Sequence, residues 1–140
     1  MQTGIARVEL RRDGFASLRI TPGAAVANAT ITLATLPQCN NGNNSNGNAS
    51  INRSLQLLLN ARVAVGGAVR VGLTGPSVPA GFSVADADEW TGDAVRGLVT
   101  WGAGTRGLNL SSLASAGAPV AITFHLARAV RLYAFEFRCV

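Results

Sequence analysis

The segment from Asp86 to Asp93 holds the one concentration of carboxylates in the sequence: Asp86, Asp88, Glu89 and Asp93. Oxygen-rich loops bind calcium, so Asp86, Asp88 and Asp93 are candidate calcium ligands. Paired carboxylates also hydrolyse glycosidic bonds, but they must face each other across a sugar-sized cleft, which neighbours on one loop rarely do. We therefore favour a solvated loop in which Asp and Thr side chains hold local turns, with no metal and no catalytic residue.

An indole within the same segment suggests sugar binding instead. Trp90 stands among polar residues, and an exposed indole stacks well on the apolar face of a sugar ring. Asp86, Asp88 and Arg96 are close in sequence and would add hydrogen bonds to the sugar. The alternative is that Trp90 folds back over the end of a sheet, and Trp101, which ends an apolar run, is expected in the core.

Other residues that commonly perform catalysis are sparse. His125 is the only histidine and lies inside the apolar run 121–127, so we expect a hydrogen-bonded structural role. The chain has no G-x-S-x-G, phosphate-binding loop or Cys-x-x-Cys motif. One histidine and two distant cysteines do not make a zinc site. A small stand-alone hydrolase is thus the least favoured of the functions considered.

Cys39 and Cys139 are the only cysteines, and the sequence leaves two alternatives open for them. A bridge would close a loop of roughly 100 residues and stabilise the fold by about 4.7 kcal/mol in the chain-entropy model. Otherwise they are two unpaired thiols, because only geometry decides the question.

N-glycosylation sequons bear on location. They begin at Asn28, Asn43, Asn48, Asn52 and Asn109. They favour an extracellular or secretory glycoprotein. The first twenty residues contain the charged run "RVELRRDG" and show no signal peptide, so the chain is either cytosolic or part of a larger secreted protein. The sequons favour the larger secreted protein.

Composition limits the partners. At 140 residues the chain fits one domain, and 48% apolar against 14% charged residues indicates a folded core. The net charge of +5 comes from arginines spread along the chain, with only Arg11 and Arg12 adjacent. Without a basic run or an apolar run of spanning length, neither nucleic acid nor a membrane is expected as a partner.

A hydrophobic period of two predicts strands rather than helices. The runs 5–10 and 15–20 alternate around Asp13-Gly14, which predicts a β-hairpin. A second hairpin is expected from Leu57–Val65 and Ala68–Leu73 around Gly66-Gly67.

Ser54–Asn60 is either a short helix or a buried strand, and its position just before this second hairpin favours a strand. Further strands are expected at Thr30–Leu36, at Ala94–Trp101 and in two closing runs at 120–126 and 130–138. One helical turn is expected near Leu110–Leu113. In the last run, Tyr133, Phe135 and Phe137 are expected to share a core-facing side.

These elements predict an all-β fold. We expect one domain over 1–140, a two-sheet antiparallel β-sandwich of jelly-roll type with eight or nine short strands. The Asn-rich stretch 37–54 is expected to be a flexible insertion.

Four pieces of the chain also follow the order of a known pattern: "GIARVELRRDGFASL" (4–18), "GFSVADADEWTGD" (81–93), "VTW" (99–101) and "LYAFEF" (132–137). Together they resemble the C-terminal β-sandwich of five-bladed-propeller proteins of the glycoside-hydrolase type. Those relatives include family 32-like (invertase and fructanase) and sialidase-like hydrolases. The Asn-rich stretch departs from the pattern as an insertion.

The resemblance implies a non-catalytic accessory module, because the catalytic carboxylates of such proteins belong to the propeller. The partner would be that N-terminal propeller, with Arg11, Arg12 and Phe15 as docking residues. The main alternative is an independent carbohydrate-binding module that uses Trp90 and the acidic segment.

Overall fold

The structure is a computed structural model that describes residues 9–10, 16–20, 23–39 and 53–140. This part of the chain contains eight strands and one short helix. The elements are β1 (Glu9–Leu10), β2 (Ala16–Arg19), β3 (Val26–Leu33), β4 (Leu55–Val63), β5 (Ala68–Thr74), β6 (Asp93–Leu98), α1 (Ser111–Ser115), β7 (Val120–Ala127) and β8 (Val130–Cys139).

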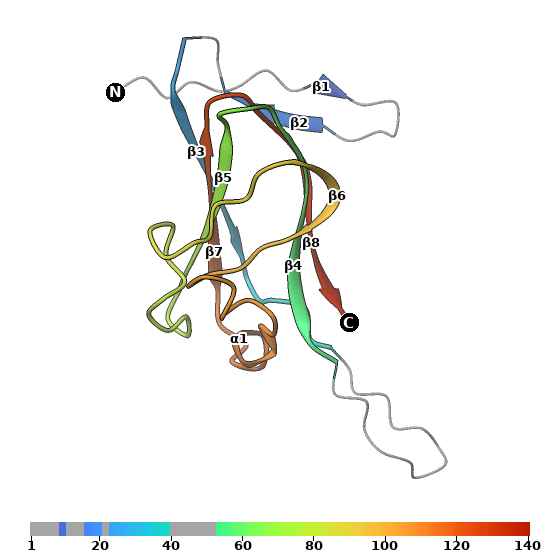
Figure 1. Cartoon of the computed structure of the whole chain (residues 1–140). Coiled ribbons are helices and arrows are strands. Elements are labelled where there is room, and N and C mark those ends of the chain that lie inside the picture. Colours follow the sequence, from blue (N-terminus) through green and yellow to red (C-terminus); the bar gives the residue numbers. More distant parts are fainter. Residues whose placement is uncertain (1–8, 11–15, 21–22, 40–52) are drawn as a thin grey trace.

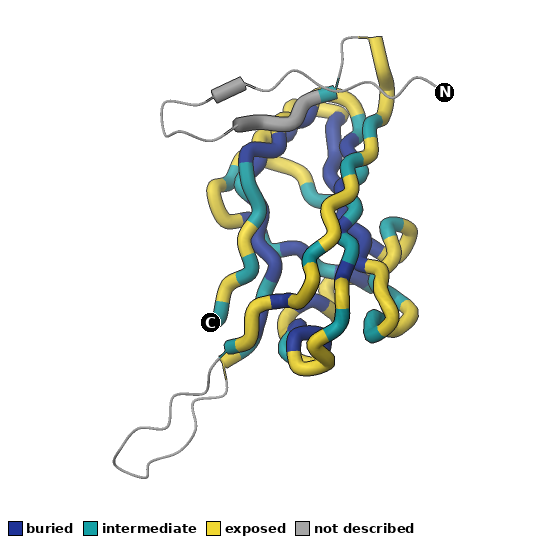
Figure 2. The backbone as a smooth tube through the Cα atoms, turned by 180° about the vertical axis from the view of Figure 1, so that it is seen from behind, coloured by how far each residue is buried: buried dark blue, intermediate teal, exposed yellow. Residues whose placement is uncertain are grey.

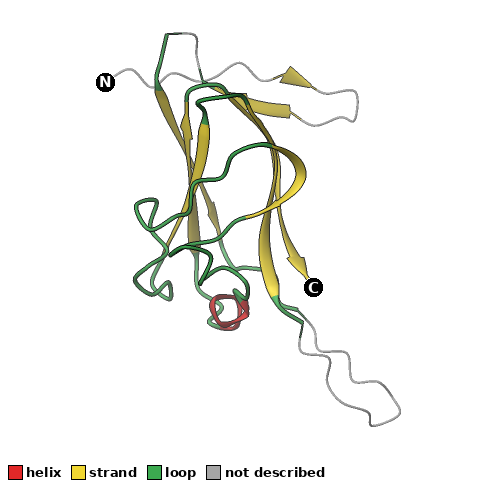
Figure 3. Cartoon of the chain, in the orientation of Figure 1, coloured by secondary structure: helices red, strands yellow, loops and turns green. Residues whose placement is uncertain are grey.

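The strands form two antiparallel sheets that face each other as a β-sandwich (Figures 1 and 3). The larger sheet has the order β1-β2-β8-β4-β6, and the smaller has the order β3-β7-β5. The predicted all-β, two-sheet antiparallel architecture is therefore confirmed. No helix within the described ranges has the length and apolar character needed to span a bilayer.

β4 is the centre of the larger sheet because it pairs with β8 on one side and β6 on the other. Its sequence places apolar residues at every second position, and Leu55, Leu57, Leu59 and Ala61 are fully buried. A strand rich in Leu with this alternation presents one dry face to the opposite sheet.

The smaller sheet supplies the other wall of the core. Its inward residues are Val69, Val71 and Leu73 from β5 and Val120, Ile122, Phe124 and Leu126 from β7. The buried stretches of the two sheets face one another across the molecule (Figure 2). Helix α1 buries Leu113 and Ala114, and it lies at one end of the sandwich (Figure 1).

The predicted pairing of β4 with β5 is wrong, although the predicted turn is real. Gly66 has a φ of 81° and lies in a turn, but β4 and β5 belong to opposite sheets. Both strands carry a continuous apolar face, and these faces are buried when they meet across the core. Packed sheets lie about 10 Å apart, a gap that a four-residue link such as 64–67 spans easily.

The predicted three-aromatic face on the last strand is reduced to two residues. Asn60 pairs with Ala134 whereas Ala61 pairs with Leu132, so Tyr133 is the extra residue of a β-bulge. Tyr133 is buried outside the main core cluster. Phe135 lies 5.1 Å from Phe124 between ring centroids, and Phe137 packs against Phe135.

The predicted N-terminal pairing is present, because β1 and β2 are antiparallel and β2 continues onto β8. The Asp13-Gly14 turn lies outside the described residues, as does most of the Asn-rich stretch 37–54. The third strand begins and ends earlier than expected, at Val26–Leu33, and the sixth ends at Leu98.

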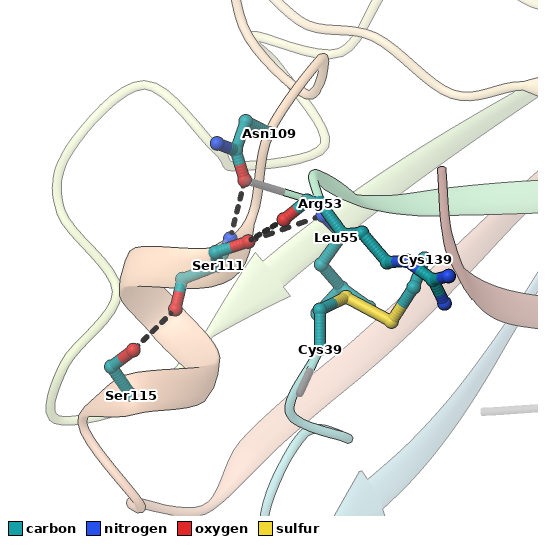
Figure 4. The surroundings of a disulfide bond; sticks show 7 residues. All are labelled: Cys39, Arg53, Leu55, Asn109, Ser111, Ser115 and Cys139. Atoms are coloured by element: carbon teal, nitrogen blue, oxygen red, sulfur yellow. Dashed lines mark hydrogen bonds between the residues drawn. A yellow bond between two sulfur atoms is a disulfide. The ribbon is translucent and has the colours of Figure 1, made fainter. Parts of the chain in front are cut away.

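A disulfide joins Cys39 to Cys139, across a sequence separation of 100 residues, so the two thiols are paired (Figure 4). It ties the segment that follows β3, in the smaller sheet, to the last residue of β8, in the larger sheet. The bond therefore links the two layers covalently near one end of the sandwich.

Replacing both cysteines with serine should lower the free energy of unfolding by about 2–5 kcal/mol, because the unfolded chain regains the freedom of a long loop. Urea titration followed by circular dichroism measures this. Dithiothreitol should destabilise the wild type and leave the double variant unchanged. Equal midpoints for the two proteins would show that the bridge carries no stability.

Candidate functional site

A row of polar side chains crosses the outer face of the smaller sheet. Asn28 of β3, His125 of β7 and Arg70 of β5 are direct cross-strand neighbours, since Asn28 pairs with His125 and His125 with Arg70. Glu89 extends the row from the loop beside β5. We call Asn28, His125, Arg70 and Glu89 the polar row.

The members of the polar row are linked by short contacts. Asn28 Oδ1 lies 2.8 Å from His125 Nδ1, and Arg70 Nη2 donates to Glu89 Oε2 at 3.2 Å. The expected hydrogen-bonded role of His125 is confirmed. The Arg70 and Glu89 side chains remain about half exposed, at 41% and 52%, so the pair is accessible to a polar ligand.

The polar row borders an open depression of about 440 Å³. Its lining consists of Ala68, Arg70, Val84, Ala85, Glu89, His125 and Ala127. The alanines leave space between the charged groups, and the charged groups supply both donors and acceptors. Such a surface suits hydrogen bonding to a hydroxyl-rich molecule.

The acidic segment is used to build the fold. The Asp88 carboxylate accepts three hydrogen bonds, from Thr100 Oγ1 at 2.6 Å and from the backbone N–H groups of Ala103 and Gly104 at 2.7 Å each. Gly102, Ala103 and Gly104 all have positive φ, so this turn directs consecutive N–H groups at one anion. The Thr100 hydroxyl, followed by these backbone donors, lowers the pKa of Asp88.

Asp86 closes a second turn. Its Oδ2 accepts hydrogen bonds from the Ser83 hydroxyl at 2.6 Å and from the Ser83 backbone N–H at 3.2 Å. The Ser83 hydroxyl is the main cause that lowers the pKa of Asp86. The preferred interpretation of the acidic segment, side chains that hold local turns, is confirmed for Asp86 and Asp88.

Trp90 closes the side of the sandwich between the two sheets. Its backbone exchanges two hydrogen bonds with Val69 of β5, while its half-buried indole lies against Gly97 of β6. Any side chain at position 97 would occupy the space of the indole. Trp90 thus folds onto the sheet edge, one of the two alternatives expected for it.

Arg96 forms an ion pair with Glu136 at 3.3 Å, whereas Asp86 accepts from Ser83 and Asp88 accepts from Thr100. The four residues predicted to bind sugar, Asp86, Asp88, Trp90 and Arg96, therefore each have a separate structural partner. Trp101 is fully buried and its indole N–H donates to the Val71 carbonyl at 2.7 Å, which confirms its expected core position.

The candidate calcium ligands do not converge either. Asp93 contacts Arg62 at 3.8 Å, whereas Asp86 and Asp88 hold their own turns. Among the residues that the structure describes, no group of three or more His, Cys, Asp or Glu could hold a metal ion.

A second depression, of about 450 Å³, lies where the chain crosses between the sheets beside β2. It is lined by Ile20, Arg62, Ala64, Arg128, Ala129, Val130 and Arg131, and we call it the basic depression. The predicted docking residues Arg11, Arg12 and Phe15 lie outside the described residues.

No family model, no curated protein and no solved structure matches the chain. Sequence reasoning missed the polar row and the basic depression. Each combines residues from several separate segments. The sheet register makes the strand residues of the polar row neighbours, and the folded chain brings the residues of the basic depression around one hollow. The one available signal was the alternation within each strand, which places Asn28, Arg70 and His125 on outward positions.

Replacing Asp88 with Asn should lower the urea midpoint at pH 7, because an amide nitrogen would face backbone N–H donors. A carboxylate whose native pKa lies below its ordinary value of 3.8 stabilises the fold above that pH. This contribution disappears as the pH falls through the native pKa, so the difference between variant and wild type should shrink below about pH 4.

Asp93→Asn is the matched control, because its ion pair with Arg62 is long and both side chains are about two-thirds exposed, at 66% and 64%. Its midpoint should stay close to that of the wild type. If the two variants behave alike, Asp88 does not hold its turn in solution.

Proposed function

We propose that this chain is a non-catalytic accessory module, a jelly-roll-like β-sandwich of an extracellular or secretory, glycoside-hydrolase-like protein, that packs on a catalytic propeller. The observation that carries the proposal is that the described carboxylates are engaged in structural contacts. The five whose side chains the structure describes all contact a structural partner: Asp86, Asp88, Glu89, Asp93 and Glu136.

Glycoside hydrolysis needs one carboxyl group with a raised pKa and a second one across the scissile bond. In this chain the pKa values of Asp86 and Asp88 are lowered rather than raised, because hydrogen-bond donors stabilise the charged carboxylates. The arrangement supports a module that leaves the chemistry to another domain. The disulfide supports the secretory location, since such bonds persist in oxidising compartments.

The basic depression supports a docking surface beside the first hairpin. β2 pairs with β8 at Arg19 and Arg131, and Ile20, which follows β2, lines the depression together with Arg131. Arg62, Arg128 and Arg131 all line this depression. Guanidinium groups form bidentate pairs with carboxylates, so an acidic rim on the propeller would fit this surface.

The purified chain should bind a separately produced invertase-type propeller domain that lacks its own sandwich, in a 1:1 complex seen by calorimetry. Arg128→Glu should weaken this binding by about tenfold or more, because it reverses one charge at the docking surface. Arg138→Glu, near the opposite end of β8, should bind as the wild type does.

Equal binding by the two charge variants would contradict the docking surface, and no complex would contradict the accessory role. Hydrolysis of glycosides by the purified chain would favour the stand-alone hydrolase instead.

A second candidate function, an independent carbohydrate-binding module, is favoured by one observation, the depression beside the polar row. Arg70, Glu89 and His125 offer planar donors and acceptors around an open hollow. This is a different place from the indole of Trp90, which rests on Gly97. The two sites make different predictions for substitution.

On a glycan array, binding through the polar row should fall at least tenfold in Arg70→Ala, because the guanidinium donors to the glycan are removed. Binding should persist in Trp90→Ala, because the indole lies elsewhere. Loss of retention only in Trp90→Ala would assign the site to the indole. No retention by the wild type would remove the carbohydrate-binding function and leave the accessory role.

A further inference from the structure

Two of the five sequons lie within the described residues, and both expose their asparagine. Asn28-Ala29-Thr30 is in β3, and Asn109-Leu110-Ser111 leads into α1. A glycan is attached through the amide nitrogen of asparagine, so the folded protein can carry it only where this nitrogen is accessible. The hydrogen bonds of the two amides show which of their atoms are engaged.

The Asn28 amide is held by its oxygen. Oδ1 can only accept, so His125 Nδ1, 2.8 Å away, carries the proton of this bond. The amide nitrogen Nδ2 makes no hydrogen bond among those described. Thr30 lies on the same face two residues on, with its hydroxyl 3.1 Å from that of Thr123. Both groups of this sequon therefore lie on the outer face of the smaller sheet.

The Asn109 amide is held in the same way by a different donor. The Ser111 backbone N–H donates to Asn109 Oδ1 at 2.9 Å, which forms an Asx turn ahead of α1. In Figure 4 the amide nitrogen of Asn109 points away from Ser111. The two sites share one pattern, an exposed asparagine whose amide oxygen is hydrogen-bonded and whose amide nitrogen makes no hydrogen bond among those described.

We propose that Asn28 and Asn109 are N-glycosylation sites. In the reaction, Asn Nδ2 bonds to the anomeric carbon of an oligosaccharide carried on a lipid pyrophosphate. The sugar–phosphate bond breaks, the lipid pyrophosphate leaves, and Nδ2 loses one proton. The proposal needs the secretory location included in the proposed function, but neither propeller docking nor sugar binding.

The position of Asn28 gives its glycan a physical role. β3 is the end strand of the smaller sheet, and no described strand pairs with its free edge. Val26 and Ile31 on this strand are 48% and 38% exposed. An open, apolar edge strand is a template for pairing with another molecule. A glycan on Asn28 shields this edge, whereas a glycan on Asn109 is at the α1 end.

The test is to secrete the full chain from eukaryotic cells behind an added signal peptide. Treatment with peptide N-glycosidase F in heavy-oxygen water, followed by peptide mapping, converts each occupied Asn to labelled Asp. Asn28 and Asn109 should be labelled, and Asn60, which is outside any sequon, should not. Unlabelled Asn28 and Asn109 in secreted, disulfide-bonded protein would overturn the proposal.

Substitutions separate the two sites. Asn28→Gln and Asn109→Gln should each lose one glycan, and Thr30→Ser, which preserves the sequon, should lose none. Asn28→Gln should form larger species in light scattering, while Asn109→Gln should stay monomeric. Equal behaviour of the two Gln variants would overturn the shielding role. Propeller binding by bacterially produced, glycan-free protein tests the proposed function separately.

Discussion

The inward face of β4 must be kept from water, and most of the structure follows from that constraint. Leu55, Leu57, Leu59 and Ala61 are fully buried on one side of a single strand. Burying a leucine side chain stabilises a fold by about 1.5–3 kcal/mol, so this strand alone favours a partner layer. β5 and β7 supply that layer, and the chain crosses between the sheets within a few residues to deliver it.

The same constraint explains how the irregular segments are used. Among the described elements no regular strand pairs with the outer edge of β5. The segment 82–90 runs along this edge instead, with backbone hydrogen bonds at Phe82 and Trp90. Its indole fills the space above Gly97, and Trp101 fills the core beside Phe82 with ring centroids 5.2 Å apart. The loops that could have carried a ligand are therefore largely occupied in sealing the core.

Tight turns in these loops expose backbone N–H groups, which require acceptors. Asp88 and Asp86 provide them, and hydrogen bonding to the charged carboxylates keeps their pKa values low. The carboxylates that suggested catalysis or metal binding in the sequence therefore hold local turns instead. What remains available for partners is the outer surface, where arginines border one depression and the polar row borders another.

The sequence by itself determined the strand character, the antiparallel sandwich class, the core position of Trp101 and the turn at Gly66. Each of these depends on the alternation of side chains within one segment, or on a single residue with unusual backbone freedom. The positive charge was also evident, because it depends on composition alone.

Tertiary structure decided the rest. Whether β4 pairs with β5 or faces it across the core depends on where the remaining strands lie, since the same short turn permits both. The bulge at Tyr133 depends on the register between β4 and β8, and the disulfide depends on the meeting of two chain segments a hundred residues apart. The polar row exists only because β3, β7 and β5 align Asn28, His125 and Arg70 side by side. Alternation assigns a residue to a face, but only the assembled sheet determines its neighbours on that face.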